Sequence, residues 1–205
     1  IQGASHESPL VGEKVADVEG IVTYTFKIGS DNYFTMQTPD GKEDDDPKTS
    51  EGIVVYLGNQ TPPEIGSLVK VTGTVEECYI DGYSDTKEET DLPVTQINAR
   101  DDRGGKVEIV ETNVDLPEPF EITSENLPDK VIDNDGLTEF DPEEDAIDFW
   151  ESLEGMLVKV EDVKAVAPQE HGDLITVLED RETDTINGGV LLKEDYANPD
   201  RIQFK

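Results

Sequence analysis

The chain has 205 residues, of which 49 are acidic and 16 are basic, so its formal net charge at pH 7 is −33. Such a charge repels phosphate backbones and anionic membranes, and it fits either a highly soluble, salt-adapted protein or one that binds divalent cations. Hydrophobic residues make up 34% of the chain; they recur in short runs, which excludes wholesale disorder, and no run approaches the roughly 20 residues of a membrane-spanning helix.

The first hundred residues are predicted to form five short strands. Residues 15–26 alternate with period two, which places Val18, Val22, Tyr24 and Phe26 on one face of a half-buried strand. Gly20 within this strand predicts a bend or bulge. The remaining strands are expected over residues 33–38, 52–58, 68–80 and 94–99. Five short strands with glycines inside the first and fourth are typical of a small Greek-key barrel of the OB type.

The second half is also predicted to be mostly β. Residues 100–105 are the expected linker, so we expect an OB-like five-stranded barrel over residues 1–103 and a second β-rich unit with one short helix over residues 104–205. Strands of this unit are expected over residues 107–111, 156–166, 174–180 and 188–194. The unit either takes a further strand from residues 201–205 or is a truncated OB-like unit that continues past Lys205.

Residues 141–155 place seven carboxylates around the only tryptophan of the chain. Asp141 before Pro142 predicts a helix cap followed by the first helical position, and Gly155 predicts the end of a helix over residues 142–154. Residues at helical spacing form one apolar stripe that is expected to be buried: Ala146, Phe149, Trp150 and Leu153. The carboxylates are then interpreted as the cap, partners of the helix dipole and a solvated face, with Asp148, Glu151 and Glu154 off the stripe.

Two acidic loops offer hard oxygen ligands at alternating positions, which suit calcium. The first loop contains Asp40, Asp44, Asp45 and Asp46, and the second contains Asp133, Asp135, Asp141 and Glu143; the chosen candidate ligands are Asp40, Asp44, Asp46, Asp133 and Asp135. Neither loop matches the EF-hand pattern; in the second loop, Asp133, Asp135 and Gly136 fit the pattern but Val131 occupies its first position. Each loop is therefore either a calcium site or an ordinary solvated loop, and no other cofactor is predicted.

Catalytic signals are few. The chain has two histidines and one cysteine, too few for a usual zinc site, and it contains no GxSxG, P-loop or GxGxxG motif. The glutamates that precede Cys78 would raise the pKa of its thiol and make it a poor nucleophile. The chain is therefore not expected to be an enzyme by itself.

An OB-like barrel can bind single-stranded nucleic acid through aromatic side chains and a basic groove. The candidate contacts on one sheet face and its loops are Tyr33, Gln37, Tyr56, Lys70 and Tyr79. Basic residues are sparse, so binding requires segregated charge or bridging cations. Aromatic residues at strand spacing also commonly belong to a core, so both interpretations stay open.

Five segments of the first half resemble the OB-like module of secreted bacterial nucleases, which are large extracellular enzymes of the endonuclease/exonuclease/phosphatase type: IQGASHESPLVGEKVADVEGIVT (1–23), YFTMQTP (33–39), TSEGIVVYLG (49–58), GSLVKVTGTVEE (66–77) and TQI (95–97). The second half is similar to the segment that follows this module, in LPEPFEI (116–122), FDPEEDAIDFWESLEGMLVKVEDV (140–163), GGVLL (188–192) and NPDRI (198–202).

The resemblance implies a non-catalytic module of a secreted or cell-surface parent protein. In that family the hydrolytic domain lies C-terminal to these modules and carries motifs such as GDFN and SDH, which this sequence lacks. The implied partners are that nuclease domain and single-stranded DNA or RNA, and no membrane is expected. Because the chain begins with Ile1, we expect a processed product. The alternatives are a structural or protein-interaction spacer stabilised by calcium, and a metal-dependent hydrolase in its own right.

Overall fold

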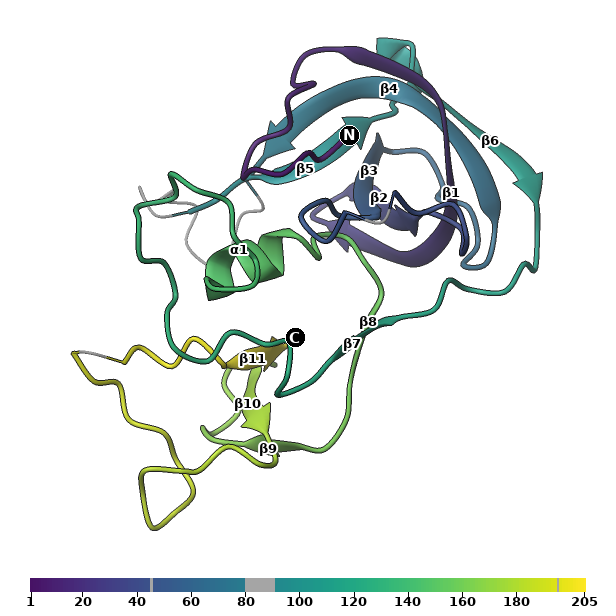
Figure 1. Ribbon diagram of the computed structural model, residues 1–205. Helices are drawn as coiled ribbons and strands as arrows, with labels where there is room; N and C mark the ends of the chain where they lie inside the picture. Colours follow the sequence, from purple (N-terminus) through teal and green to yellow (C-terminus); the bar gives the residue numbers. More distant parts are fainter. Residues whose placement is uncertain (45, 80–90, 195) are drawn as a thin grey trace. The chain divides into compact units, whose positions relative to one another are not determined.

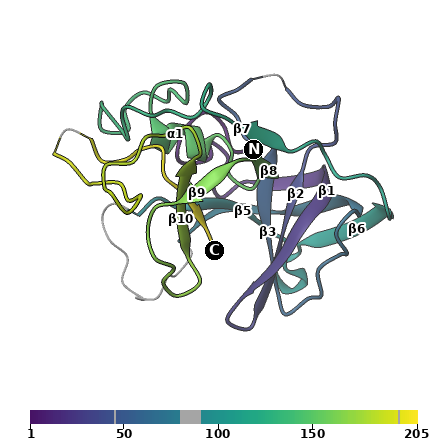
Figure 2. The same ribbon diagram turned by 90° about the horizontal axis from the view of Figure 1, so that it is seen from below.

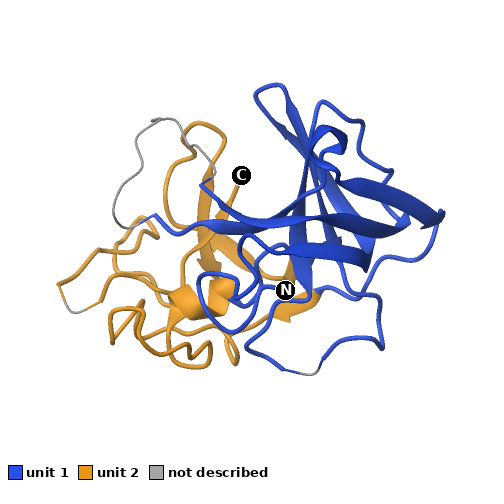
Figure 3. Cartoon of the chain, turned by 90° about the horizontal axis from the view of Figure 1, so that it is seen from above, with its two compact units in different colours: residues 1–119, 152–157 blue, residues 120–151, 158–205 orange. Residues whose placement is uncertain are grey.

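The computed structural model describes residues 1–44, 46–79, 91–194 and 196–205 (Figure 1). The chain divides into two compact units (Figure 3). Unit 1 comprises Ile1–Pro119 and Ser152–Leu157, and unit 2 comprises Phe120–Glu151 and Val158–Lys205. Asp45 of the first acidic loop and Ile80 at the end of the predicted fourth strand lie outside the described residues.

Unit 1 is built on a closed ring of five strands. These are β1 (Lys14–Ile28), β2 (Asp31–Gln37), β3 (Gly52–Gly58), β4 (Leu68–Cys78) and β5 (Val94–Asn98). They pair in the order β1-β2-β3-β5-β4, and a further pairing of β1 with β4 closes the ring (Figure 1). The β3–β5 pair is parallel and the other pairs are antiparallel. This arrangement confirms the predicted OB-like five-stranded barrel.

The barrel interior is filled by alternate side chains of its strands. On β4, Val69, Val71, Gly73 and Val75 are buried, whereas Lys70, Thr72 and Thr74 are only partly buried, which is the predicted period-two pattern. The same interior receives aromatic and aliphatic side chains from the other strands: Val22, Phe34, Met36, Ile53, Val55, Leu57 and Ile97. All of these core residues lie in segments that the sequence predicted to be strands.

Strand β1 departs from the predicted single face because it contains two register shifts. One lies between Val15 and Val18 and the other between Val22 and Tyr24. An extra residue in a strand turns the following side chains to the opposite face. Val22 is therefore fully buried, whereas Tyr24 is 59% exposed. Gly20 lies between the two shifts, and its missing side chain leaves room for Met36.

The sheet of the barrel continues beyond the linker that was predicted at residues 100–105. The short 3₁₀ helix η1 (Asp101–Arg103) leads into β6 (Lys106–Glu111), which pairs antiparallel with β4. A Cβ atom on Gly105 would lie 2.3 Å from the carbonyl carbon of Ala99, so this connection is a tight turn. The glycines of residues 100–105 suit either a turn or a linker. The pairing of β6 with β4 makes the segment a turn within the sheet.

Unit 2 contains two small sheets and one helix. Strand β7 (Phe120–Ile122) pairs parallel with β8 (Val158–Val160). Strands β9 (Val163–Ala165), β10 (Leu174–Leu178) and β11 (Ile202–Phe204) form an antiparallel sheet in the order β11-β10-β9 (Figure 2). The fold is mostly β with a second β-rich unit, as predicted. Residues 202–204 do supply a strand, whereas residues 107–111 pair in unit 1.

Residues 188–194 are not a strand, and the strand predicted over residues 156–166 is two short strands. The side chains of Asp184 and Thr185 accept hydrogen bonds from the backbone N–H groups of Leu191 (3.0 Å) and Gly189 (2.7 Å). These local bonds use donors that a strand would present to a neighbour.

The helix α1 spans Ala146–Glu151 and is shorter than the predicted residues 142–154. The backbone N–H groups of Ala146 and Ile147 donate to the carbonyl oxygens of Val131 and Ile132, at 3.2 and 3.1 Å. These long-range bonds replace the first intrahelical partners, so the residues after Pro142 form turns instead of a helix. No helix in the described part of the chain is long and apolar enough to cross a membrane.

Candidate functional site

Four aromatic rings and one guanidinium form a continuous row on the outer face of the barrel. This aromatic row consists of Tyr24, Phe26, Tyr33, Tyr56 and Arg100. Successive ring centroids lie 5.9, 5.2 and 4.9 Å apart, with interplanar angles of 15, 13 and 24°. The guanidinium carbon of Arg100 lies 5.3 Å from the centroid of the last ring. All of these residues belong to unit 1.

Strand register brings the row together. The second bulge of β1 turns Tyr24 and Phe26 outward, and Phe26 pairs with Tyr33, which in turn pairs with Tyr56. Directly opposed residues on adjacent strands hold their side chains about 5 Å apart, which suits stacked rings. The row therefore depends on three strands and on a bulge that the alternating sequence pattern does not reveal.

The two ends of the row differ chemically. Tyr33 is only 9% exposed because it lies between two rings, whereas Tyr24 at the open end is 59% exposed. At the other end, the Tyr56 hydroxyl donates a hydrogen bond to the Asp31 carboxylate at 2.8 Å. This bond to Asp31, together with burial, raises the pKa of the Tyr56 phenol. Tyr56 therefore stays neutral and fixed in orientation, and the accessible ring face belongs to Tyr24.

The five predicted nucleic-acid contacts do not form one group. Tyr33 and Tyr56 lie in the aromatic row. Gln37 is 5% exposed, and its Oε1 accepts a hydrogen bond from the Leu157 N–H at 2.8 Å, so it supports the fold. Lys70 lies on β4 opposite Glu19 of β1 and Glu108 of β6.

Tyr79, the fifth predicted contact, follows the end of β4 and is half-buried. The sequence interpretation did not choose Tyr24, Phe26 or Arg100 as contacts, although all three are members of the row. The signal for Phe26 was its alternation with Tyr24, and the signal for Arg100 was its place among the few basic residues of unit 1.

The carboxylates of the first acidic loop organise its own backbone. The Asp44 carboxylate accepts hydrogen bonds from the Asp46 N–H (2.9 Å) and the Thr49 hydroxyl (2.9 Å). Asp46 accepts from the Lys48 N–H at 3.0 Å, and Asp40 accepts from the Glu118 N–H at 3.0 Å. Within the described residues, Asp40, Asp44 and Asp46 belong to neither of the groups of side chains that could hold a metal ion.

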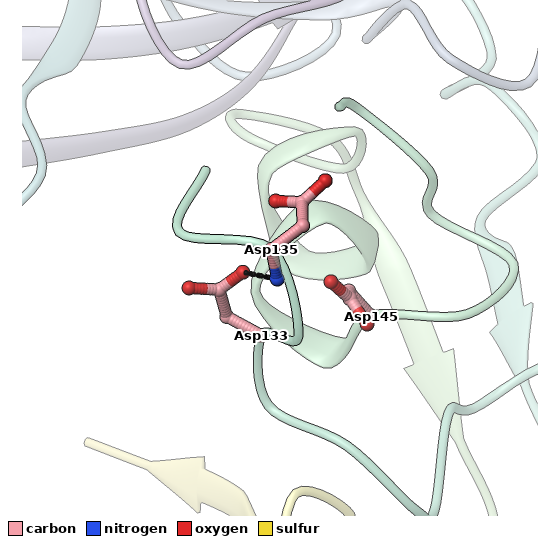
Figure 4. A group of neighbouring side chains, drawn as sticks. All are labelled: Asp133, Asp135 and Asp145. Atoms are coloured by element: carbon pink, nitrogen blue, oxygen red, sulfur yellow. Dashed lines mark hydrogen bonds between the residues drawn. The ribbon is translucent and has the colours of Figure 1, made fainter. Parts of the chain in front are cut away.

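Five aspartates of unit 2 form an acidic cluster around the start of α1. They are Asp133, Asp135, Asp141, Asp145 and Asp148. Two overlapping groups have carboxylate oxygens within 4.8 Å of one another: Asp133 with Asp135 and Asp145 (Figure 4), and Asp141 with Asp145 and Asp148. Asp145 belongs to both groups. Either group could hold a metal ion, because clustered carboxylate oxygens are the ligands that hard cations prefer.

Backbone and amide donors orient the cluster. Asp145 accepts hydrogen bonds from the backbone N–H and the side-chain amide of Asn134, at 3.1 and 2.8 Å. Asp133 accepts from the Asp135 N–H at 3.1 Å (Figure 4). Asp148 accepts from the Asp141 N–H at 2.8 Å. These hydrogen bonds fix the orientation of several carboxylates of the cluster.

The prediction that Asp148 and Glu154 belong to a solvated face of the helix was wrong, whereas Asp145 does lie directly before the first helical residue, Ala146. Asp145 and Asp148 are each 1% exposed, because residues 131–141 fold back over the start of α1. Glu154 lies beyond the short helix, and its Oε1 accepts a hydrogen bond from the Thr95 N–H at 3.0 Å. Phe149 of the predicted stripe is buried and packs against Phe120 and Trp150, as expected.

Residues 109–205 match a family model described as a domain of unknown function (DUF8508). The match begins within β6 and runs to the last residue. No curated protein and no solved structure matches the chain. The comparisons therefore assign no activity to the aromatic row or to the acidic cluster.

Proposed function

We propose that this chain is a non-catalytic module of a secreted multidomain nuclease and that its barrel binds single-stranded DNA or RNA. The observation that carries the proposal is the aromatic row on the outer face of an OB-like barrel. Proteins that bind single strands combine aromatic side chains, on which bases stack, with cations that follow the backbone. The row contains both kinds of group, with Tyr24 at one end and Arg100 at the other.

Tyr24 is the residue on which a base would stack. Its ring contacts Phe26 on one side and is 59% exposed. Stacking of one base on an aromatic ring contributes about 1–3 kcal/mol to binding. The net charge of −33 opposes binding, so affinity is expected to depend on low ionic strength or on divalent cations.

The larger context of the proposal comes from the resemblance to secreted nucleases. The matching segments cover much of both units, and they imply a catalytic domain outside residues 1–205. The barrel would hold a substrate strand for that domain, and the parent protein would be secreted or attached to the cell surface. This part of the proposal predicts that the isolated chain binds single strands but does not cleave them with magnesium, manganese or calcium.

Fluorescence anisotropy with a labelled single-stranded oligonucleotide at low salt, with and without millimolar calcium, tests the binding proposal. Tyr24→Ala should weaken binding by about 5- to 150-fold, the range that loss of one stacked base implies. Arg100→Gln should weaken binding and reduce its dependence on monovalent salt. Phe204→Ala in unit 2 is the control, because Phe204 is also exposed, at 38%, but lies on β11. The proposal fails if the wild-type chain does not bind in either condition, or if folded Tyr24→Ala binds as tightly as wild type.

The acidic cluster supports a second candidate function, a structural spacer stabilised by calcium. Calcium takes 6–8 oxygen ligands from carboxylates, carbonyls and water. Asp145 and Asp148 are each 1% exposed, and buried carboxylates are costly unless a cation or hydrogen bonds compensate their charge. A calcium ion in either group would reduce the repulsion among the three carboxylates of that group.

Thermal unfolding at increasing calcium concentrations tests this function. A ligand of the folded state stabilises it by RT ln(1 + [L]/Kd), so the melting temperature should rise with calcium. Asp145→Asn should remove this rise because Asp145 belongs to both groups of the cluster. Asp44→Asn in the first acidic loop should preserve it. A melting temperature that does not respond to millimolar calcium, or an equal loss of response in both variants, contradicts the calcium site.

A further inference from the structure

The segment Ser152–Leu157, here called the anchor segment, attaches to the barrel although its sequence neighbours on both sides belong to unit 2. The Glu154 carbonyl oxygen accepts hydrogen bonds from the Ser50 hydroxyl (2.6 Å) and the Gln2 amide (3.2 Å). The Leu157 N–H donates to Gln37 at 2.8 Å. The chain therefore leaves and re-enters unit 2 through a segment held by polar contacts to the barrel.

Two glycines let the anchor segment approach β3 at backbone distance. A Cβ atom on Gly52 would lie 2.3 Å from the carbonyl carbon of Gly155. Gly155 has φ of 75°, in the left-handed region that favours glycine, and a Cβ there would meet the backbone nitrogen of Ile53 at 2.9 Å. Such a close contact fixes the position of the neighbouring Glu154 side chain.

Two carboxylates meet at Thr95 of β5, next to this contact. Glu154 accepts from the Thr95 N–H at 3.0 Å, and Glu77 of β4 accepts from the Thr95 hydroxyl at 3.1 Å. Glu77 also accepts from the Ser8 N–H of the N-terminal segment at 2.7 Å. The groups that face Glu154 from the N-terminal segment and β5 are the uncharged Gln2 and Thr95, and β4 contributes Glu77. No cationic side chain of the described residues forms an ion pair with either carboxylate.

Burial raises the pKa of the Glu154 carboxyl from 4.5 to about 7, since hydrogen bonds from Gln2 and Thr95 lower it less and the Glu77 charge raises it further. Near neutral pH this carboxyl therefore changes its charge at the point where the anchor segment meets the barrel.

We propose that Glu154 is a proton-dependent latch: its protonated form holds the anchor segment on the barrel, and its ionised form, repelled by Glu77 and poorly hydrated, loosens the segment. In a detached segment the carboxyl would have its ordinary pKa of 4.5. Attachment is then strongest below that value and weakens as pH rises through about 7. The full change in the attachment equilibrium is about 300-fold, since each unit of pKa difference is a factor of ten.

Hydrogen–deuterium exchange of the Thr95 and Leu157 amides in the whole chain, corrected for the intrinsic pH dependence of exchange, tests the latch. Protection of both amides should fall by about tenfold between pH 6 and pH 8, which is the last part of a decline that begins near pH 4.5 and levels off above pH 7. Glu154→Gln keeps the shape of the side chain and cannot ionise, so its protection should not change with pH. Glu77→Gln should move the transition to lower pH.

Glu76→Gln is the matched control, because Glu76 is a neighbouring carboxylate of β4 that binds the Asn98 amide instead of the anchor segment. It should show the wild-type profile. Constant wild-type protection overturns the latch, as does a pH dependence that persists in Glu154→Gln, which would assign the transition to other groups. A Glu154→Gln chain that fails to fold also overturns it, since the uncharged form is the one proposed to hold. If Glu77→Gln does not fold, the Glu154→Gln profile decides the question.

Discussion

Replacement of Gly52 by alanine should destabilise unit 1 strongly, although alanine is normally the better strand residue. Glycine within a strand costs roughly 0.5–1 kcal/mol relative to alanine because of its greater freedom in the unfolded chain. At Gly52, however, the new Cβ would lie 2.3, 2.4 and 2.5 Å from three backbone atoms of Gly155 and Met156. Backbone atoms cannot rotate away, so the anchor segment must move by about 1 Å to reach normal carbon contact distances.

The size of the effect follows from the contacts that such a movement breaks. The anchor segment accepts hydrogen bonds from Ser50 and Gln2 and donates one to Gln37. Each such bond contributes about 0.5–1.5 kcal/mol to stability. After subtraction of the gain from alanine itself, Gly52→Ala should lower the free energy of unfolding by about 0.5–4 kcal/mol, with a central value of about 2 kcal/mol.

Urea denaturation followed by far-UV circular dichroism measures this change as a shift in the midpoint. Gly20→Ala is the control, because its new Cβ would meet only the flexible side chain of Met36, at 2.9 Å. That variant should stay within about 1 kcal/mol of wild type, because methionine adapts to irregular space. A Gly52→Ala chain as stable as wild type, or a Gly20→Ala chain that loses as much stability, would refute the reasoning.

Three further predictions concern buried polar groups. The folded-state pKa of Glu154 is raised to about 7, so its contribution to stability is complete below pH 4.5 and is lost as pH rises to about 7. The free energy of unfolding, measured by urea denaturation at a series of pH values, should therefore fall by up to about 3 kcal/mol over this range. Arg181 pairs at 2.6 Å with Asp200, whose side chain is 7% exposed, so Arg181→Ala should cost about 3–5 kcal/mol of stability by leaving a buried charge without its ion-pair partner. Thermal unfolding measures this loss. The control is Lys159→Ala, which removes an exposed ion pair and should cost less than about 1 kcal/mol. Tyr56→Phe removes the donor to Asp31 and should cost about 1 kcal/mol in urea denaturation, whereas an unchanged stability would mean that this bond only orients the ring.

Local sequence patterns predicted the barrel well because alternation is a property of single strands. The buried valines of β4 and the apolar run of β3 identify strands without knowledge of their partners. The apolar stripe around Phe149 likewise predicted a helix, but its length depended on Val131 and Ile132, which take the first helical N–H groups from a distance in sequence. The helix propensity of residues 142–154 carries no information about hydrogen-bond acceptors that lie so far away in the sequence.

By itself, the sequence determined which segments are extended, which residues are apolar enough for a core, and that Tyr33, Tyr56, Asp133 and Asp135 merit attention as site residues. Only the tertiary structure decided which of these residues meet. The bulge of β1 brought Phe26 into the aromatic row, and the folded loop before α1 buried Asp145 and Asp148. The physical reason is that burial and pairing depend on residues far apart in the chain, whereas hydrophobic periodicity reports only on near neighbours.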